Sequence, residues 1–173
     1  MTMHVRAALP GEIPALAKLW YNGWQDAHAA LMPAELTRLR TEQSFAERLA
    51  AALPRIRVVG PEGAPIGFAI VKDDELYQLF VAADARGKGV AVTLIEDAET
   101  RLAASGVETA WLACAIGNER AARFYEKRGW RRIGTFSNEI ETSEGPFNLD
   151  VCRYEKRLGT LSSGERADTH RQV

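Results

Sequence analysis

The segment from residue 75 to residue 104 changes its hydrophobic pattern midway, and this change limits the folds open to the chain. Residues 75–82, ELYQLFVA, form an apolar and aromatic run that is typical of a strand. Residues 85–89, ARGKG, follow as a basic turn with two glycines. The next residues have helical spacing, with one apolar face made of Leu94, Ile95, Ala98 and Leu102. A strand that opens through such a turn into a helix is a favoured place for ligand sites.

Further strands and helices are predicted on both sides of this unit. β-branched or alternating runs predict strands at residues 4–9, 55–60, 65–72, 108–115, 129–140 and 147–158. Helical spacing predicts helices that start near Ile13 and that cover about 41–53 and 118–129. Residues 29–40 are predicted to be helical or irregular, and either Thr41 or Ser44 caps the helix that follows. The order predicts an α+β fold, with a mixed, mostly antiparallel sheet of about six to seven strands and about four helices.

The chain is expected to form a single domain over residues 1–158. Its length suits one hydrophobic core, and no internal repeat or linker interrupts it. The tail 159–173 has almost no apolar side chains and is predicted to be disordered.

Charge and cysteine content narrow the classes of partner. The 22 Lys and Arg side chains nearly balance 23 Asp and Glu, for a net charge of −1. Nucleic-acid binders normally have a basic surplus, so nucleic acid is not an expected partner. The chain has no apolar leader and no run of roughly eighteen apolar residues, so no membrane association is expected. Cys114 and Cys152 lack CxxC spacing and are expected to be reduced thiols of a cytoplasmic protein.

The glycine turn has the chemistry of an anion site. The first turn of a helix leaves backbone amides without partners, and the helix dipole makes that end partly positive. Gly87 and Gly89 leave the backbone bare for an approaching phosphate, while Arg86 and Lys88 add positive charge. An ordinary surface turn, with glycines present for backbone reasons alone, is the alternative.

Two common nucleotide motifs do not fit the turn. The P-loop pattern GxxxxGK[ST] fails because Ala82 occupies the first glycine position and Gly89 follows Lys88. The dinucleotide pattern GxGxxG fails because Val92 occupies the third glycine position. Kinases, other P-loop enzymes and Rossmann dehydrogenases are therefore poor fits.

A third pattern, [Q/R]-x-x-G-x-[G/A], is matched by Arg86, Gly89 and Ala91. It resembles the acetyl-coenzyme A signature of the GNAT (GCN5-related) N-acetyltransferases. The segment NERAARFYEKRGW, residues 118–130, resembles a second segment of that family, N-x-x-A-x-x-[FL]-Y-x-x-x-G-[FW]. The resemblance extends over nearly all of residues 3–158. It implies the GNAT fold, acetyl-CoA as co-substrate and no metal.

The resemblance implies how the coenzyme is held. The pantetheine arm would pair with the backbone of Phe80 and Val81, as an extra strand does. The pyrophosphate would accept hydrogen bonds from the backbone amides of the turn, with Arg86 at its rim. These amides belong to Gly87, Lys88, Gly89, Val90 and Ala91. Asn118 matches a position that contacts the coenzyme, and it equally suits the N-cap of the following helix.

The resemblance also implies two catalytic roles. Tyr125 matches the tyrosine that protonates the departing thiolate, and a phenol keeps its proton at neutral pH. The alternative for Tyr125 is a core aromatic side chain. Glu75 is the nearest candidate for the general base, although an exposed turn residue is the alternative. Four other residues or a water chain remain candidates for the base: Asp73, Asp74, Tyr77 and Gln78.

The acceptor is expected to be a primary amine of a small molecule. Tyr21, Trp24 and His28 lie at helical spacing and are candidate substrate-binding residues, with packing in the core as the alternative. No metal is expected at His28, because no second ligand lies at a recognisable spacing. A protein or peptide acetyltransferase and a non-catalytic acyl-CoA sensor remain alternatives, and a homodimer is possible within the family.

Overall fold

The computed structural model describes residues 3–159, so most of the tail predicted to be disordered lies outside the described residues. One seven-stranded sheet has the order β1-β2-β3-β4-β5-β7-β6, and its only parallel pair is β4 with β5. This confirms the predicted mixed, mostly antiparallel sheet. The strands are β1 (Val5–Ala7), β2 (Ile56–Val59), β3 (Gly67–Lys72), β4 (Glu75–Val81), β5 (Thr109–Ala115), β6 (Arg131–Thr142) and β7 (Gly145–Arg157).

Five α-helices are present within the described residues. They are α1 (Ile13–Ala27), α2 (Ala34–Leu39), α3 (Glu42–Ala52), α4 (Val90–Ala104) and α5 (Glu119–Lys127). The short α2 lies in the segment that was predicted to be helical or irregular. Thr41 caps α3, because its hydroxyl oxygen accepts from the amide of Ser44 at 3.0 Å. None of these helices is long and apolar enough to cross a membrane.

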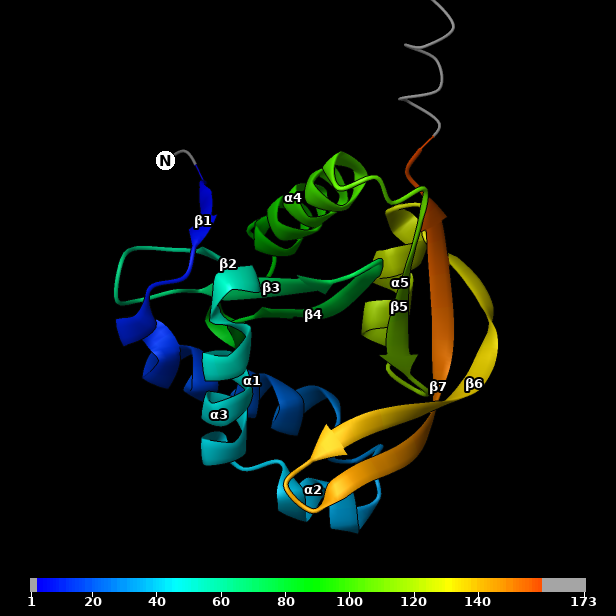
Figure 1. The fold of residues 1–173 in the computed structure, drawn as a ribbon. Coiled ribbons are helices and arrows are strands. Elements are labelled where there is room, and N and C mark those ends of the chain that lie inside the picture. The colour runs from blue at the N-terminus through cyan, green and yellow to red at the C-terminus, as the bar shows by residue number, and fades with distance from the viewer. Residues whose placement is uncertain (1–2, 160–173) are drawn as a thin grey trace, which may run out of the picture.

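The sheet lies between two apolar clusters, and alternate residues of its strands supply them. On β2, Val58 packs with α1 and α3, while Val59 packs with α4. On β3, Phe68 and Ile70 face the first side and Ala69 the second. This alternation follows from the period of two in a strand. Figure 1 shows α4 on one side of the sheet and α1 with α3 on the other.

Two glycines let helices approach β3 and β4 closely. A Cβ at Gly23 of α1 would lie 2.6 Å from the Phe80 ring on β4. A Cβ at Gly67 of β3 would lie 2.8 Å from Cγ1 of Val90, the first residue of α4. Real Cβ atoms do not come so near, so only glycine permits this packing. The start of α4 is therefore fixed against the sheet.

β4 and β5 are joined at one end only. A single residue pair, Glu75 opposite Trp111, defines their register. Next to this pair, the Trp111 amide donates a hydrogen bond to the Asp74 carbonyl oxygen at 3.1 Å. A bulge bends β4, because Gln78 pairs with Ile70 and Leu76 with Val71, which leaves Tyr77 as the extra residue. The β5–β7–β6 part of the sheet is turned steeply against β1–β4 (Figure 1). The two strands therefore open toward their carboxyl ends.

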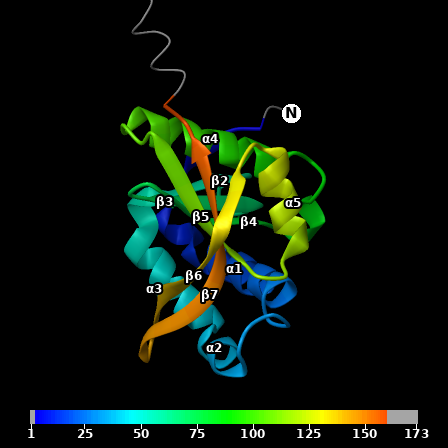
Figure 2. The ribbon, with the colours of Figure 1, turned by 90° about the vertical axis from the view of Figure 1, so that its right-hand side faces the viewer.

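The β6–β7 hairpin extends beyond the sheet and reaches α2. Figure 2 shows its far end beside this helix. Arg38 forms an exposed ion pair with Glu144 at 2.8 Å, and Arg40 Nη1 donates to the Glu141 carbonyl oxygen at 3.0 Å. The hairpin and α2 thus pack with the apolar cluster on the α1 and α3 side of the sheet.

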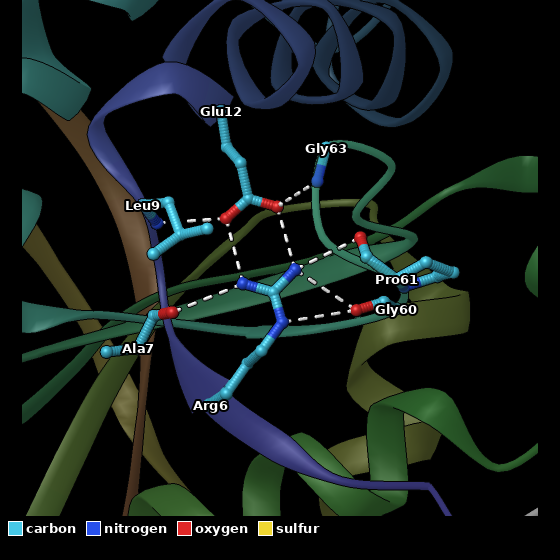
Figure 3. Close-up of polar contacts among 7 residues, drawn as sticks. All are labelled: Arg6, Ala7, Leu9, Glu12, Gly60, Pro61 and Gly63. Atoms are coloured by element: carbon cyan, nitrogen blue, oxygen red, sulfur yellow. Dashed lines mark hydrogen bonds and ion pairs between the residues drawn. The ribbon is translucent and has the colours of Figure 1, made fainter.

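A buried carboxylate fixes the beginning of α1. Glu12 is 2% exposed and accepts two hydrogen bonds from the Arg6 guanidinium, at 2.9 and 2.7 Å (Figure 3). It also accepts from the amides of Leu9 and Gly63, at 2.9 and 3.1 Å. The hydrogen bond from Arg6 is the main cause that lowers the pKa of Glu12 to about 2. The network ties β1, the start of α1 and the loop between β2 and β3 together.

The Glu12→Gln variant is expected to be less stable by about 3 kcal/mol at neutral pH, because it leaves the Arg6 charge without its partner. The folded pKa of Glu12 lies below its ordinary value, so its stabilising effect is complete above about pH 5 and is lost toward pH 2. Urea unfolding at several pH values should show the difference from the unaltered protein shrinking as pH falls. Arg38→Gln, which removes an exposed ion pair, should cost less than about 1 kcal/mol. Equal losses for the two variants would contradict this account.

Candidate active site

Two cavities meet where β4 and β5 diverge. The larger cavity, of about 300 Å³, is lined by parts of α1, β4, β5 and α5 and reaches the glycine turn. The smaller cavity, of about 130 Å³, is lined by parts of α1, α2, α3, β4 and β5 and by the β6–β7 hairpin. Six residues line both: His28, Tyr77, Gln78, Phe80, Ala113 and Ala115. The two cavities therefore adjoin at the point where the two strands diverge.

The glycine turn leaves its amides open at the start of α4. Gly87 and Gly89 have φ angles of 77° and 83°, in the left-handed region that favours glycine. A Cβ at either position would meet no atom within 4 Å, so the space in front of the backbone is open. The Thr93 amide donates a hydrogen bond to the Gly89 carbonyl oxygen at 3.0 Å. The amides before Thr93 belong to the first turn of the helix, where backbone N–H groups have no partner within the helix. The arrangement can hold an anion.

The predicted cofactor-binding residues gather around this turn and the larger cavity. Those that line the larger cavity are Phe80, Val81, Arg86, Ala91 and Asn118. Gly87, Lys88 and Gly89 are exposed in the adjoining turn, and the Val90 side chain is buried. Arg86 Nη2 forms an ion pair with Asp26 of α1 at 2.8 Å, so its charge is partly engaged. Asn118 is the N-cap of α5, since its Oδ1 accepts from the Ala121 amide at 3.3 Å, and its side chain still borders the cavity.

Tyr125 of α5 lies on the wall of the larger cavity. Its ring packs against Trp130 and Tyr154, with centroids 6.4 and 6.2 Å away. Burial, with a smaller effect from Cys114, raises its pKa above the ordinary value of a phenol. Tyr125 is therefore both a packed aromatic side chain and a protonated phenol at the cavity.

Glu75 lines the smaller cavity, at the first residue of β4. It is half-buried, so the alternative of an exposed turn residue is wrong. Burial is the main cause that raises its pKa to about 7; Asp74 and Asp73 raise it further, and Lys72 and Arg153 oppose the shift. A carboxyl with this pKa can accept and release a proton near neutral pH.

His28 follows α1 and lines both cavities. Its ring stacks on Trp24, with centroids 5.9 Å apart, and lies 6.0 Å from Phe80. Burial lowers its pKa to about 4, so the imidazole is neutral at pH 7. Its Nδ1 atom is buried and has no hydrogen-bond partner within the described part of the chain.

The predicted substrate-binding residues are only partly brought together. Trp24 lines the smaller cavity with His28. Tyr21 instead lines an open depression between α1 and α2. Helical spacing alone placed these three side chains on one face, but their directions differ enough to separate Tyr21 from the other two. Within residues 3–159 no group of three or more His, Cys, Asp or Glu side chains could hold a metal ion.

Several cavity residues were not found by sequence reasoning. Arg40 and Arg48 line the smaller cavity and come from either side of α3's first turn. Cys114 lines the larger cavity beside Tyr125, and burial raises the pKa of its thiol to about 11. The hairpin adds Asn138, Ile140, Leu149 and Val151. The pairing of β5 with β7, which are distant in sequence, brings these four hairpin residues to the site.

Comparison with known proteins gives one consistent family. Residues 16–130 match the family described as Acetyltransferase (GNAT) family. An uncharacterised N-acetyltransferase of Mycobacterium tuberculosis is 30% identical over 112 residues, which are 62% of this chain and 69% of that protein. The peptidyl-lysine N-acetyltransferase YjaB of Salmonella typhimurium is 27% identical over 149 residues, 86% of this chain and 96% of that protein.

Solved structures share the fold. A GCN5-related N-acetyltransferase from Rhodopseudomonas palustris superposes with a TM-score of 0.71 at 24% identity, and covers 91% of this chain and 96% of its own. The PaiA N-acetyltransferase of Thermoplasma acidophilum, solved in complex with coenzyme A, gives a TM-score of 0.67 at 19% identity and covers 91% and 99%.

The raised pKa of Glu75 predicts a pH-dependent cost to stability. The folded protein holds this proton more tightly than the unfolded chain, so ionisation between about pH 4.5 and pH 7 disfavours folding. Glu75→Gln should therefore raise the melting temperature at about pH 8 and have a smaller effect at about pH 5. Glu139→Gln, at an exposed position of β6, is the control. A Glu75→Gln effect that does not grow with pH would show that Glu75 titrates normally.

Proposed function

The chain belongs to the GNAT acetyltransferase family and is an acetyl-CoA-dependent N-acetyltransferase, and from that premise we propose that its acceptor is the primary amine of a small molecule. The observation that carries this proposal is a pair of adjoining cavities where β4 and β5 diverge, one of which reaches the open glycine turn while the other is small. A donor in the first cavity and an acceptor in the second would meet at the strands' opening.

The coenzyme would occupy the larger cavity. Its pyrophosphate would accept hydrogen bonds from the open amides of residues 87–91, where the positive end of the α4 dipole adds attraction. Its pantetheine arm would run along Phe80 and Val81, in the gap that β5 leaves beside β4. The thioester would then lie near the residues that both cavities share.

The chemistry needs one base and one acid. Glu75, with a pKa near 7, would take a proton from the acceptor's ammonium group through water. The neutral amine nitrogen would attack the thioester carbonyl carbon, so that a C–N bond forms and the C–S bond breaks. Tyr125, which keeps its proton because burial raises its pKa, would protonate the departing thiolate, and the new amide nitrogen would give up its second proton to restore the phenol.

A direct transfer fits the cysteines better than an acyl-enzyme does. Cys114 is the thiol at the larger cavity, and burial raises its pKa to about 11. At neutral pH it is a neutral thiol, and a thiolate is the form that attacks a thioester. The amine itself is therefore the nucleophile in our proposal. Two free thiols also suit a reducing, cytoplasmic environment.

The size of the smaller cavity favours a small acceptor. Its volume is about 130 Å³, close to that of a cavity that holds one benzene molecule. The β6–β7 hairpin and α2 form part of its wall. A peptide lysine is the second candidate, because YjaB is a peptidyl-lysine N-acetyltransferase. A lysine peptide would have to reach the cavity past the hairpin.

Calorimetry with acetyl-CoA and a thiol-release assay with a panel of amines test the proposed function. The protein should bind acetyl-CoA and release thiol with small amines faster than with lysine peptides. Gly89→Ala should weaken acetyl-CoA binding about tenfold or more, because a Cβ at positive φ distorts the turn. Gly106→Ala is the matched control, since Gly106 has a φ of 92° and open space but lies at the other end of α4. Equal weakening by both variants would remove the turn from the coenzyme site.

Variants of the proposed acid and base should separate the two roles. In the unaltered protein kcat should rise with pH through about 7 and then level as Glu75 becomes ionised. Glu75→Gln should lower kcat by about 100-fold and abolish this rise. Tyr125→Phe should lower kcat by a similar factor of about 100 but keep acetyl-CoA affinity. Full kcat in Tyr125→Phe across pH would exclude it as the acid.

A further inference from the structure

The smaller cavity contains two arginines without an acidic partner. Arg40 is 4% exposed, and the Glu141 carbonyl oxygen, at 3.0 Å, is the single acceptor that its guanidinium contacts within residues 3–159. Arg48 Nη2 donates to the Tyr77 hydroxyl at 2.7 Å, and its guanidinium lies 4.4 Å above the Trp20 ring. Among the described residues neither arginine forms an ion pair with Asp or Glu.

An unpaired buried charge is costly, so its presence needs an explanation. A guanidinium has five N–H donors, and the fold uses one of those on Arg40. Burial is the main cause that lowers the Arg40 pKa to about 10, and the nearby Arg48 charge adds to it. Two cations that repel each other at the wall of one cavity form a site for an anion.

The fold itself does not need the charge of Arg40. The tie between α2 and the hairpin is a hydrogen bond to a carbonyl oxygen, which a neutral donor could also make. Arg38, two residues earlier, makes a comparable tie to Glu144, and its charge is exposed and paired. The buried and unpaired arginine is therefore the one that lines the cavity.

Glu75 is not the missing partner. It lines the same cavity, and the cations that act on its pKa are Lys72 and Arg153. The cavity thus has two separate polar features, a pair of arginines and a carboxyl that takes up protons near neutral pH. A molecule that carries both an anionic and an amino group matches the two.

We propose that the acceptor amine carries a carboxylate, that Arg40 and Arg48 bind this group, and that the substrate class is therefore small amino acids. This inference rests on the proposed function. The planar fork of a guanidinium matches a carboxylate through paired hydrogen bonds. With the carboxylate held by the arginines, the amino group is free to turn toward the residues that both cavities share.

The experiment compares matched acceptors in the thiol-release assay. Amino acids of graded length, from glycine to γ-aminobutyrate, are each tested against the corresponding amide, which keeps the amine and removes the negative charge. At least one acid should exceed its amide in kcat/KM by about 30-fold. Aminomethylphosphonate and taurine show whether another anionic group serves as well. Amides, polyamines or lysine peptides that react as fast as the best acid would overturn the inference.

Arginine variants locate the effect. Arg40→Gln should lower kcat/KM for the preferred acid by about 30-fold, change that for its amide by less than about threefold, and keep acetyl-CoA affinity. Arg38→Gln is the matched control and should retain the full preference for the acid. Equal loss for acid and amide in Arg40→Gln would overturn the inference.

Two further measurements keep the inference testable. If Arg40→Gln does not fold, Arg48→Gln is expected to show the same selective loss. In the unaltered protein the N-acetylated acid product should inhibit the reaction more strongly than its amide, and equal inhibition would overturn the inference. Absence of acetyl-CoA binding in the calorimeter would instead reject the proposed function, so the two failures can be told apart.

Discussion

β4 and β5 share one register pair, Glu75 opposite Trp111, and diverge beyond it. Beyond that pair, the backbone N–H and C=O groups on the facing edges of β4 and β5 do not hydrogen-bond to each other. Buried backbone groups need other hydrogen-bond partners. Both cavities lie at this divergence and share lining residues there. Three features surround this gap: the bulge at Tyr77, the close approach of α4 at Gly67 and the long β6–β7 hairpin. The site follows from strands that pair only at their beginning.

The buried and half-buried titratable side chains are of two kinds, those with an ion-pair partner and those without one. Glu12 is satisfied by Arg6 and two amides, and it serves to fix the start of α1. Within residues 3–159 Glu75, His28 and Arg40 form no ion pair, and all three are buried or half-buried and line the smaller cavity. Unsatisfied polar groups cost stability, and they concentrate where a ligand can satisfy them. The contrast separates the supporting frame from the reactive centre within one small protein.

Sequence patterns predicted the features that depend on neighbouring residues, but not those that depend on contacts between distant segments. The turn at Gly87 and Gly89, the cap at Asn118 and the face of α4 depend on residues near in sequence, and each formed as expected. The burial of Glu75 and the ion pair of Arg86 with Asp26 depend on contacts between distant segments. Arg40 contacts the hairpin through the carbonyl oxygen of Glu141, which lies 101 residues later in the sequence. Sequence spacing contains no information on such contacts, which explains why the acceptor cavity was the part least well predicted.

The two proposals support one another through electrostatics. A zwitterionic acceptor held by Arg40 and Arg48 would bring a cationic ammonium toward a carboxyl whose pKa burial has raised to about 7. A nearby cation favours the ionised form of a carboxyl, so the arriving substrate would itself convert Glu75 into the base. His28, kept neutral by burial, would not repel that ammonium. Once the proton has moved, the carboxyl and the amine are both neutral, and the free amine is left as the nucleophile beside the thioester.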